Sequence, residues 1–300
     1  MIDRVLTARS HGLRLWVRSS GPASGPTVVL AMGAGASSVW WPDELIGELI
    51  AAGFHVVRFD SRDTGLSDSA TTPYVLDDLV DDLTAVLDAV DVASAHLIGV
   101  SMGGMLAQRL ALRAPQRVAS LTLIATSCEP ASTRLGGRRP DVVEVAARPR
   151  TSLAEYRELE LELRRRLSGP AFAFDADAVA ATIDADIARG VDLECRHARA
   201  VFTAPPWTAE LERLRVPTAI MHGTHDPVFA LAHAQAIASA VEHSTLHVWS
   251  GAGHELPPSK SGAIVAALIG HASATDGYGR RSDDAGAQPQ MGADDATPPA

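Results

Sequence analysis

Short runs of consecutive apolar residues recur along this chain, and most are followed by a stretch with helical periodicity. An apolar run without polar alternation is typical of a strand that is buried on both faces. Such strands in alternation with helices predict a mostly parallel sheet with helices on both faces. Residues 5–8 and 13–18 instead alternate polar and apolar side chains, which predicts an antiparallel hairpin at one edge of the sheet. The strands predicted for the rest of the sheet are residues 27–32, 54–59, 95–100, 118–125, 218–222 and 245–249.

The alternation of strands and helices is interrupted between residues 127 and 213, where helical segments follow one another without a buried strand. We therefore predict an α/β core formed by residues 1–126 and 214–273, with residues 127–213 inserted as a helical cap. A last helix is predicted over residues 261–269. Residues 274–300 consist largely of Gly, Ala, Asp, Pro and Gln, with almost nothing to bury, and predict a disordered tail.

One apolar run leads directly into the sequence Gly-Val-Ser-Met-Gly (residues 99–103), and residues 105–114 have helical periodicity. A Gly-x-Ser-x-Gly sequence between a strand and a helix predicts a sharp turn that exposes the serine hydroxyl. The glycines allow neighbouring backbone to approach without a Cβ clash. The turn also places the hydroxyl at a helix N-terminus, which favours negative charge. Ser101 is therefore the candidate nucleophile.

A serine hydroxyl becomes a good nucleophile when a base accepts its proton and a carboxylate orients that base. In an open parallel sheet, functional side chains collect beyond the carboxyl ends of the strands. The loop after the last predicted strand contains His254, and the loop after the strand before it contains Asp226. The order Ser101, Asp226, His254 is also the chain order expected of a nucleophile-elbow enzyme.

Two members of this triad have alternatives. Glu129 follows the predicted strand 118–125 and is a second candidate for the acid. Other histidines lie near the same strands, but only His254 occupies a glycine-rich loop just past the last strand. These other histidines are His222, His225, His243 and His247.

The transition state of acyl transfer needs N–H donors for its developing oxyanion. The backbone N–H of Met102 is one candidate, because it follows the nucleophile. The loop of residues 32–36 after the first buried strand is expected to supply the other, with Ala34 as the donor.

Several apolar side chains are candidates for the walls of a substrate pocket, because such pockets are lined mainly by hydrophobic and aromatic residues. The alternative for the aromatic residues of the cap is that they pack the cap onto the sheet. The candidate wall residues are Met32, Trp41, Phe202 and Trp207, with Phe172 and Phe174 as further aromatic residues of the cap.

Composition argues against several other classes of function. The formal net charge of the 300 residues is -10 and no basic block is present, so nucleic acid is not an expected partner. No apolar run approaches the length of a membrane span, and we expect a soluble, cytoplasmic protein. Cys128 and Cys195 are too few for a disulfide framework and are expected to be reduced packing residues. Four aspartates of the segment 76–90 are interpreted as a solvated helix face and not as a metal site: Asp77, Asp78, Asp81 and Asp82.

Over residues 5–272 the chain resembles the α/β-hydrolase superfamily. The motifs that carry this resemblance are the serine elbow of residues 99–103, the loop Asp-Ser-Arg-Asp-Thr-Gly-Leu-Ser (60–67), Gly-Thr-His-Asp-Pro (223–227) and Gly253-His254. In this superfamily the residue after the nucleophile and the residue that matches Ala34 supply the oxyanion amides, which agrees with the donors named above.

More narrowly, the chain resembles the methylesterases of anthracycline biosynthesis, of the aclacinomycin methylesterase type. Many α/β-hydrolases carry His-Gly at the oxyanion loop, whereas this chain has Met32-Gly33, a departure that the narrower group shares. The other motifs of this likeness are Trp-Pro-Asp-Glu (41–44), Arg-Phe-Asp (58–60), Arg-Asp-Thr-Gly (62–65) and Leu-Pro (256–257) after the candidate base.

We therefore expect a serine carboxylic-ester hydrolase that acts on a small to medium apolar ester through an acyl-enzyme on Ser101. This chemistry requires no metal or organic cofactor. A cofactor-free perhydrolase, or an acyltransferase that uses an alcohol in place of water, would employ the same triad. A ligand-binding protein of the same fold without catalytic activity is the alternative from a different class. The sequence predicts no oligomeric state.

Overall fold

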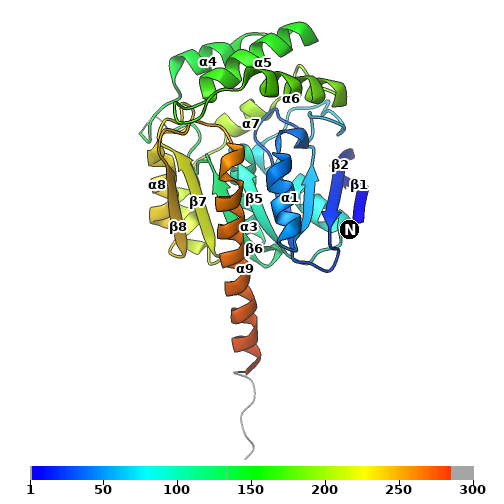
Figure 1. Cartoon of the computed structure of the whole chain (residues 1–300), viewed down its shortest axis with the longest axis vertical. Helices are drawn as coiled ribbons and strands as arrows, with labels where there is room; N and C mark the ends of the chain where they lie inside the picture. Colours follow the sequence, from blue (N-terminus) through cyan, green and yellow to red (C-terminus); the bar gives the residue numbers. More distant parts are fainter. Residues whose placement is uncertain (1, 133, 285–300) are drawn as a thin grey trace, which may run out of the picture.

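The computed structural model describes residues 2–132 and 134–284, and an 8-stranded sheet forms its centre (Figure 1). The strands are β1 (Ile2–Ser10), β2 (Leu13–Gly21), β3 (Thr27–Ala31), β4 (His55–Phe59), β5 (Ala95–Val100), β6 (Val118–Ile124), β7 (Thr218–Gly223) and β8 (Ser244–Trp249). Their order is β1-β2-β4-β3-β5-β6-β7-β8. The hairpin β1–β2 and the pair β2–β4 are antiparallel, and all other pairs are parallel. The predicted mostly parallel sheet is confirmed.

The burial of the central strands follows their sequence pattern. Every residue of β3, β5 and β7 is buried, as expected for continuous apolar runs covered on both faces. Strand β2 alternates buried and partly buried residues over most of its length, because it lies near the edge of the sheet beside the outer strand β1.

Helices cover both faces of the sheet and enclose two apolar layers. Helices α1 and α9 pack on one face, which is turned toward the viewer in Figure 1. Helices α2, α3 and α8 bury their apolar sides in the layer on the other face. The helices of the core are α1 (Asp43–Ala51), α2 (Leu76–Ala89), α3 (Met102–Arg113), α8 (Leu231–Ala240) and α9 (Ser261–Asp284).

Helix α9 is longer than the sequence predicts. It continues to Asp284, and Figure 1 shows its last turns running beyond the sheet. Helix α9 therefore includes residues 274–284 of the segment for which the sequence predicts disorder. No proline interrupts residues 270–284, so the ladder of helical hydrogen bonds can continue. Residues 285–300 of the predicted tail lie outside the described residues.

Helices α4 (Pro140–Ala147), α5 (Leu153–Leu167), α6 (Ala176–Arg189) and α7 (His197–Phe202) lie between β6 and β7 in the chain. Figure 1 shows α4, α5 and α6 together above one end of the sheet, where they form the cap. Ser152 and Asp175 accept backbone N–H groups at the starts of α5 and α6, which stabilises these helix ends. Short 3-10 helices also occur in the connections: η1 (Ser38–Trp40), η2 (Pro115–Arg117), η3 (Thr208–Arg213) and η4 (Pro258–Lys260). None of the helices in the described part of the chain is both long and apolar enough to cross a bilayer.

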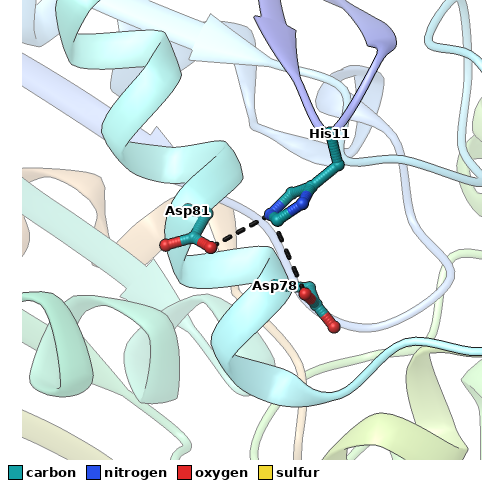
Figure 2. A group of neighbouring side chains, drawn as sticks. All are labelled: His11, Asp78 and Asp81. Atoms are coloured by element: carbon teal, nitrogen blue, oxygen red, sulfur yellow. Dashed lines mark hydrogen bonds and ion pairs between the residues drawn. The ribbon is translucent and has the colours of Figure 1, made fainter.

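The exposed carboxylates of α2 pair with groups around them. His11 in the loop between β1 and β2 has its Nε2 atom 3.0 Å from Asp81 Oδ2 and 3.8 Å from Asp78 Oδ1 (Figure 2). Asp81 also lies 2.6 Å from Arg113 Nη2. Surface pairs of this kind contribute about 0–1 kcal/mol each to stability. Asp78 and Asp81 thus occupy a partly solvated helix face, as predicted.

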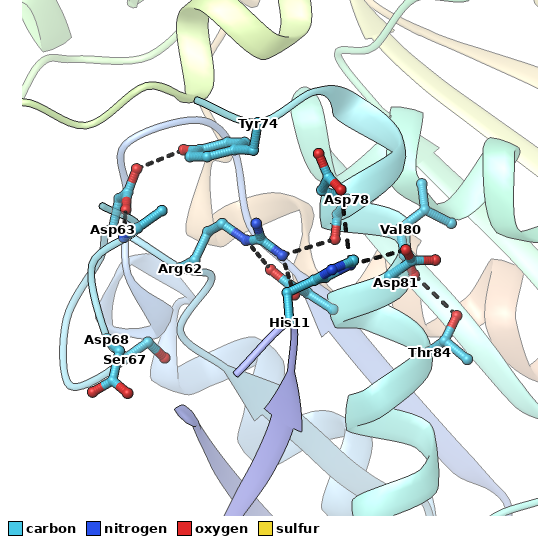
Figure 3. Close-up of polar contacts among 12 residues, drawn as sticks. His11, Arg62, Asp63, Ser67, Asp68, Tyr74, Asp78, Val80, Asp81 and Thr84 are labelled. Carbon is cyan, nitrogen blue, oxygen red and sulfur yellow. Dashed lines mark hydrogen bonds and ion pairs between the residues drawn. The ribbon is translucent and has the colours of Figure 1, made fainter. Parts of the chain in front are cut away.

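A buried ion pair joins the loop after β4 to the same helix. Arg62 donates from Nε and Nη2 to the two carboxylate oxygens of Asp82, at 2.6 Å each, and both residues are buried. Figure 3 shows the Arg62 side chain reaching from the loop toward α2, and its guanidinium lies 5.0 Å from the centre of the Tyr74 ring. The prediction that Asp82 belongs to the solvated face is wrong, because its position on α2 faces a buried guanidinium.

Removing one partner of this ion pair should destabilise the fold. We expect Asp82→Ala to lower the free energy of unfolding by about 3–5 kcal/mol, because the Arg62 charge would stay buried without a partner. Urea unfolding followed by circular dichroism measures the change. The matched control is Asp81→Ala on the exposed side of α2, for which we expect a loss below about 1 kcal/mol. Equal losses in the two variants would contradict a special role for the buried pair.

Candidate active site

Ser101 lies at the sharp turn between β5 and α3. Its φ of 52° and ψ of -115° are an unfavourable backbone conformation for a residue with a Cβ, with a cost of about 1–3 kcal/mol. Two of the hydrogen bonds at Ser101 join the turn to β6 and the residues after it: the Ser101 N–H donates to Ile124 O at 2.9 Å, and Thr126 Oγ1 donates to Ser101 O at 2.7 Å. This is the strained nucleophile turn that the Gly-x-Ser-x-Gly sequence predicts.

The two glycines of the motif make this turn possible. A Cβ on Gly99 would lie 2.4 Å from the carbonyl carbon of Gly103, and a Cβ on Gly103 would lie 1.9 Å from the oxygen of Ala31. Backbone atoms stand at both clash points, so no side-chain rotation could relieve the overlap. Helix α3 can therefore approach β3 and β5 closely only with glycine at these positions.

The loops after β7 and β8 bring Asp226 and His254 into contact. His254 Nδ1–H donates to Asp226 Oδ2 at 2.7 Å. The second carboxylate oxygen, Oδ1, accepts the N–H groups of Val228 and Phe229, at 2.8 Å each. With Nδ1 as the donor, Nε2 of the neutral imidazole is the acceptor, which is the tautomer that can take a proton from a hydroxyl.

Asp226 is held as a carboxylate although it is buried. Burial alone raises its pKa, but the charge and hydrogen bond of His254 outweigh burial, with smaller contributions from His222 and the Phe229 N–H, and the pKa stays below its usual value. His222 Nε2 donates to Phe229 O at 2.7 Å, and burial lowers the pKa of His222, which favours its neutral form. Asp226 therefore gives His254 a fixed negative partner.

Glu129, the alternative acid, has other partners. Its Oε1 atom accepts Thr208 Oγ1 at 2.6 Å and Arg134 Nη2 at 2.9 Å. The hydrogen bond from Thr208 is the main cause of a lowered Glu129 pKa. Among the contacts of the described residues, none joins Glu129 to His254, so the geometry favours Asp226 as the acid.

Ser101 and His254 line one cavity of about 310 Å³. That volume is at the small end of the range for pockets that bind small molecules. Within residues 2–132 and 134–284, no hydrogen bond joins Ser101 Oγ to His254. The candidate base and acid are thus in contact, while the candidate nucleophile lines the same cavity. A hydrogen bond between nucleophile and base commonly tightens only when substrate is present.

The two candidate oxyanion donors come from the start of α3 and from the loop after β3. Met102 is the first residue of α3, so its N–H has no acceptor within that helix. Ala34 lines the cavity in the loop after β3. The next N–H in that loop, from Gly35, donates to His197 Nδ1 at 3.0 Å. Burial lowers the pKa of His197 to about 4, so its imidazole is neutral and can accept.

His197 was not among the predicted site residues, although it ties the cap to the loop that carries Ala34. Its role depends on a contact between α7 and the loop after β3, which are distant in sequence. No local motif marks such a contact.

Two of the four predicted wall residues line the cavity, namely Met32 and Phe202. Trp41 and Trp207 do not, and for these two the expectation is corrected. Trp41 is buried in the apolar layer beneath α1. Trp207 is buried against α3, where its Nε1 atom donates to Gln108 Oε1 at 3.2 Å. Both rings pack in the core, and for Trp207 this is the alternative stated for the aromatic residues of the cap. Phe172 and Phe174 also lie outside the lining.

The chain is similar to known proteins over most of its length. The family model described as alpha/beta hydrolase fold matches residues 26–260. Rhodomycin D methylesterase DnrP of Streptomyces peucetius is 32% identical, over 91% of this chain and 99% of that protein. 3-Oxoadipate enol-lactonase 2 of Acinetobacter baylyi is 26% identical, over 81% of this chain and 87% of its own length.

Among solved structures, the esterase RhEst1 from Rhodococcus sp. ECU1013 has a TM-score of 0.74, with 23% identity over 91% of this chain and 99% of its own. That likeness concerns the fold. The resemblance drawn from the sequence, to this superfamily and to methylesterases within it, is confirmed by the family model and by the methylesterase relative. The chain belongs to the α/β-hydrolase family.

Proposed function

We propose that this protein is a serine carboxylic-ester hydrolase that cleaves esters of small alcohols such as methanol. The observation that carries the proposal is the 2.7 Å hydrogen bond from His254 to Asp226, next to the cavity that Ser101 enters from its strained turn. The 32% identity to a protein named as a methylesterase supports the small alcohol.

The proposed reaction uses the groups of this site in two steps. Ser101 Oγ attacks the ester carbonyl while His254 Nε2 takes its proton, and the oxyanion accepts the N–H groups of Ala34 and Met102. The intermediate collapses when His254 returns the proton to the leaving alcohol, which leaves an acyl-enzyme on Ser101. Water then attacks the acyl carbon with His254 as base, and the acid is released.

We expect a fluorophosphonate to label Ser101 and to abolish turnover of para-nitrophenyl acetate and butyrate in parallel. A phosphonate mimics the tetrahedral intermediate, so it reacts with a serine only where a base and oxyanion donors are in place. Mass spectrometry of the labelled peptide identifies the residue, and heat-denatured protein is the control. Tight binding of esters without turnover and without labelling would contradict a hydrolase and favour a ligand-binding protein.

A separate experiment determines whether water, hydrogen peroxide or an alcohol accepts the acyl group from Ser101. Hydrogen peroxide or an added alcohol, present with the ester, competes with water for the acyl-enzyme. We expect acid to remain the main product. A main product of peracid or of a new ester would identify a perhydrolase or an acyltransferase with the same triad.

A further inference from the structure

Arg138 carries a positive charge on the wall of the active-site cavity without a carboxylate partner. It lines the same cavity as Ser101 and His254, and its guanidinium carbon lies 3.8 Å from the centre of the Phe202 ring. Burial against the cavity wall lowers the pKa of Arg138, but an arginine pKa starts so high that the group stays charged. Arg138 remains exposed to solvent, and no carboxylate of the described chain lies within ion-pair distance of its guanidinium.

The carboxylates on the cavity wall, in contrast, all accept hydrogen bonds from protein donors. Glu160 is paired with Arg164, with Oε1 2.6 Å from Nη2. The donors to the others are as follows: Tyr74 Oη and the Ala70 N–H to Asp63, Trp40 Nε1 and Ser37 Oγ to Asp186, and the Glu194 N–H to Asp192. The cavity therefore has an arginine available for an anion, and its acids already have partners.

A second arginine, Arg150, also lines the cavity without a carboxylate partner in the described chain. Its Nη1 atom donates to the carbonyl oxygens of Ala146 and Arg148, at 3.3 Å and 3.1 Å. That nitrogen is used by the protein itself. The guanidinium of Arg138 has no hydrogen bond to any described residue and can offer its paired N–H groups to a ligand.

A row of aromatic rings connects Arg138 with the base. The Phe202 ring beneath Arg138 lies 6.3 Å from the Phe229 ring, and the Phe229 ring lies 5.7 Å from the His254 imidazole, measured between centres. Both phenylalanines line the cavity. A ligand that lies along these rings has an apolar surface for its body, an arginine at one end and His254 at the other.

We propose that Arg138 binds a carboxylate on the acyl part of the substrate, so that the enzyme acts on monoesters of dicarboxylic acids with an apolar or aromatic spacer. This inference rests on the proposed ester hydrolysis. The planar guanidinium matches a carboxylate with two parallel N–H groups. Because the acyl part stays bound after the alcohol leaves, the same contact would hold the acyl-enzyme for attack by water.

The test compares two esters of nearly equal shape: monomethyl terephthalate, which is an anion, and methyl para-carbamoylbenzoate, which is neutral. The corresponding biphenyl pair tests a longer spacer. We expect Arg138→Gln to lower kcat/KM for the anionic ester about tenfold or more relative to the neutral ester, mainly through KM. Comparing the ratio between variants cancels the intrinsic reactivity of the esters. The matched control is Arg139→Gln, since Arg139 is paired with Asp141 and does not line the cavity. Thermal melting checks the fold of each variant.

If Arg138→Gln left the ratio of kcat/KM for the anionic ester to kcat/KM for the neutral ester unchanged, the inference would be overturned. If only Arg150→Gln removed the preference for the anionic ester, the assignment to Arg138 would be overturned. Calorimetric binding of terephthalate, which needs no turnover, separates this inference from the proposed function. Terephthalate binding that depends on Arg138, in a protein that hydrolyses no ester, would support the anion site and reject the hydrolase. Ester turnover without any dependence on Arg138 would support the hydrolase and reject the anion site.

Discussion

Ser101→Ala is expected to reduce kcat/KM for para-nitrophenyl butyrate by about 10⁵-fold, with the fold unchanged. The variant keeps the cavity, the oxyanion N–H groups and the pair of His254 and Asp226, but it has no atom that can form the acyl-enzyme. Residual hydrolysis would come from water activated by His254, which is far less effective than a bound nucleophile.

The stability of this variant should stay within about 0.5 kcal/mol of the wild type. Ser101 Oγ makes no hydrogen bond to another described residue, so its removal leaves no partner unsatisfied. Alanine also keeps the Cβ, so the backbone strain at a φ of 52° is the same in both proteins. A loss of activity in this variant therefore reports on chemistry and not on folding.

Steady-state kinetics on freshly purified protein, with urea unfolding in parallel, measures both quantities. The control is Ser69→Ala, because Ser69 is an exposed serine that does not line the cavity. We expect the control to keep wild-type activity. If Ser101→Ala retained a tenth of the wild-type kcat/KM, another group would have to be the nucleophile.

The parts of this molecule that the sequence predicts well are those that local pattern determines. The run 95–100 has no polar alternation, and every residue of β5 is buried. The glycines around Ser101 mark a turn that no other residue type would permit, because a Cβ would strike backbone. Asp226 and His254 were predictable because parallel strands end at one edge of a sheet, so their loops must meet there.

The parts that escaped prediction depend on contacts between distant segments. The sequence places Asp82 among the polar residues of α2, but in the structure Asp82 contacts Arg62 from the loop after β4. His197 receives its role from Gly35, which lies 162 positions earlier. Trp41 was named as a candidate wall residue of the cavity, but it packs in the apolar layer beneath α1. Periodicity shows which face of an element is apolar, but it does not show which other segment packs against that element.

Asp226→Asn is the second substitution with a large expected effect, about 10⁴-fold in kcat. In the wild type, Oδ1 of Asp226 accepts the Val228 and Phe229 N–H groups, and Oδ2 accepts His254 Nδ1–H. The amide oxygen of asparagine must stay on the two backbone donors, because its NH₂ group cannot accept them. The NH₂ group then faces His254 Nδ1 and forces that nitrogen to be the acceptor.

The consequence is that the proton of His254 moves to Nε2, where it blocks transfer from Ser101. Nitrogen NMR of the labelled imidazole reads this change directly: Nδ1–H in the wild type and Nε2–H in the variant. A purely structural role of Asp226 would lower stability without exchanging the tautomer. Phosphonate labelling of Ser101 should slow together with turnover, because both need the same base.

Glu129→Gln is the matched control for this substitution, since it also exchanges a carboxylate for an amide. Glutamine can still accept from Thr208, and the lost charge faces the exposed Arg134, so we expect activity close to that of the wild type. The opposite pair of results, with Asp226→Asn active and Glu129→Gln inactive, would transfer the role of the acid to Glu129. That outcome would require Glu129 to leave both of its partners and reach His254. His254 already donates to the Asp226 carboxylate, which two backbone N–H groups also hold in place.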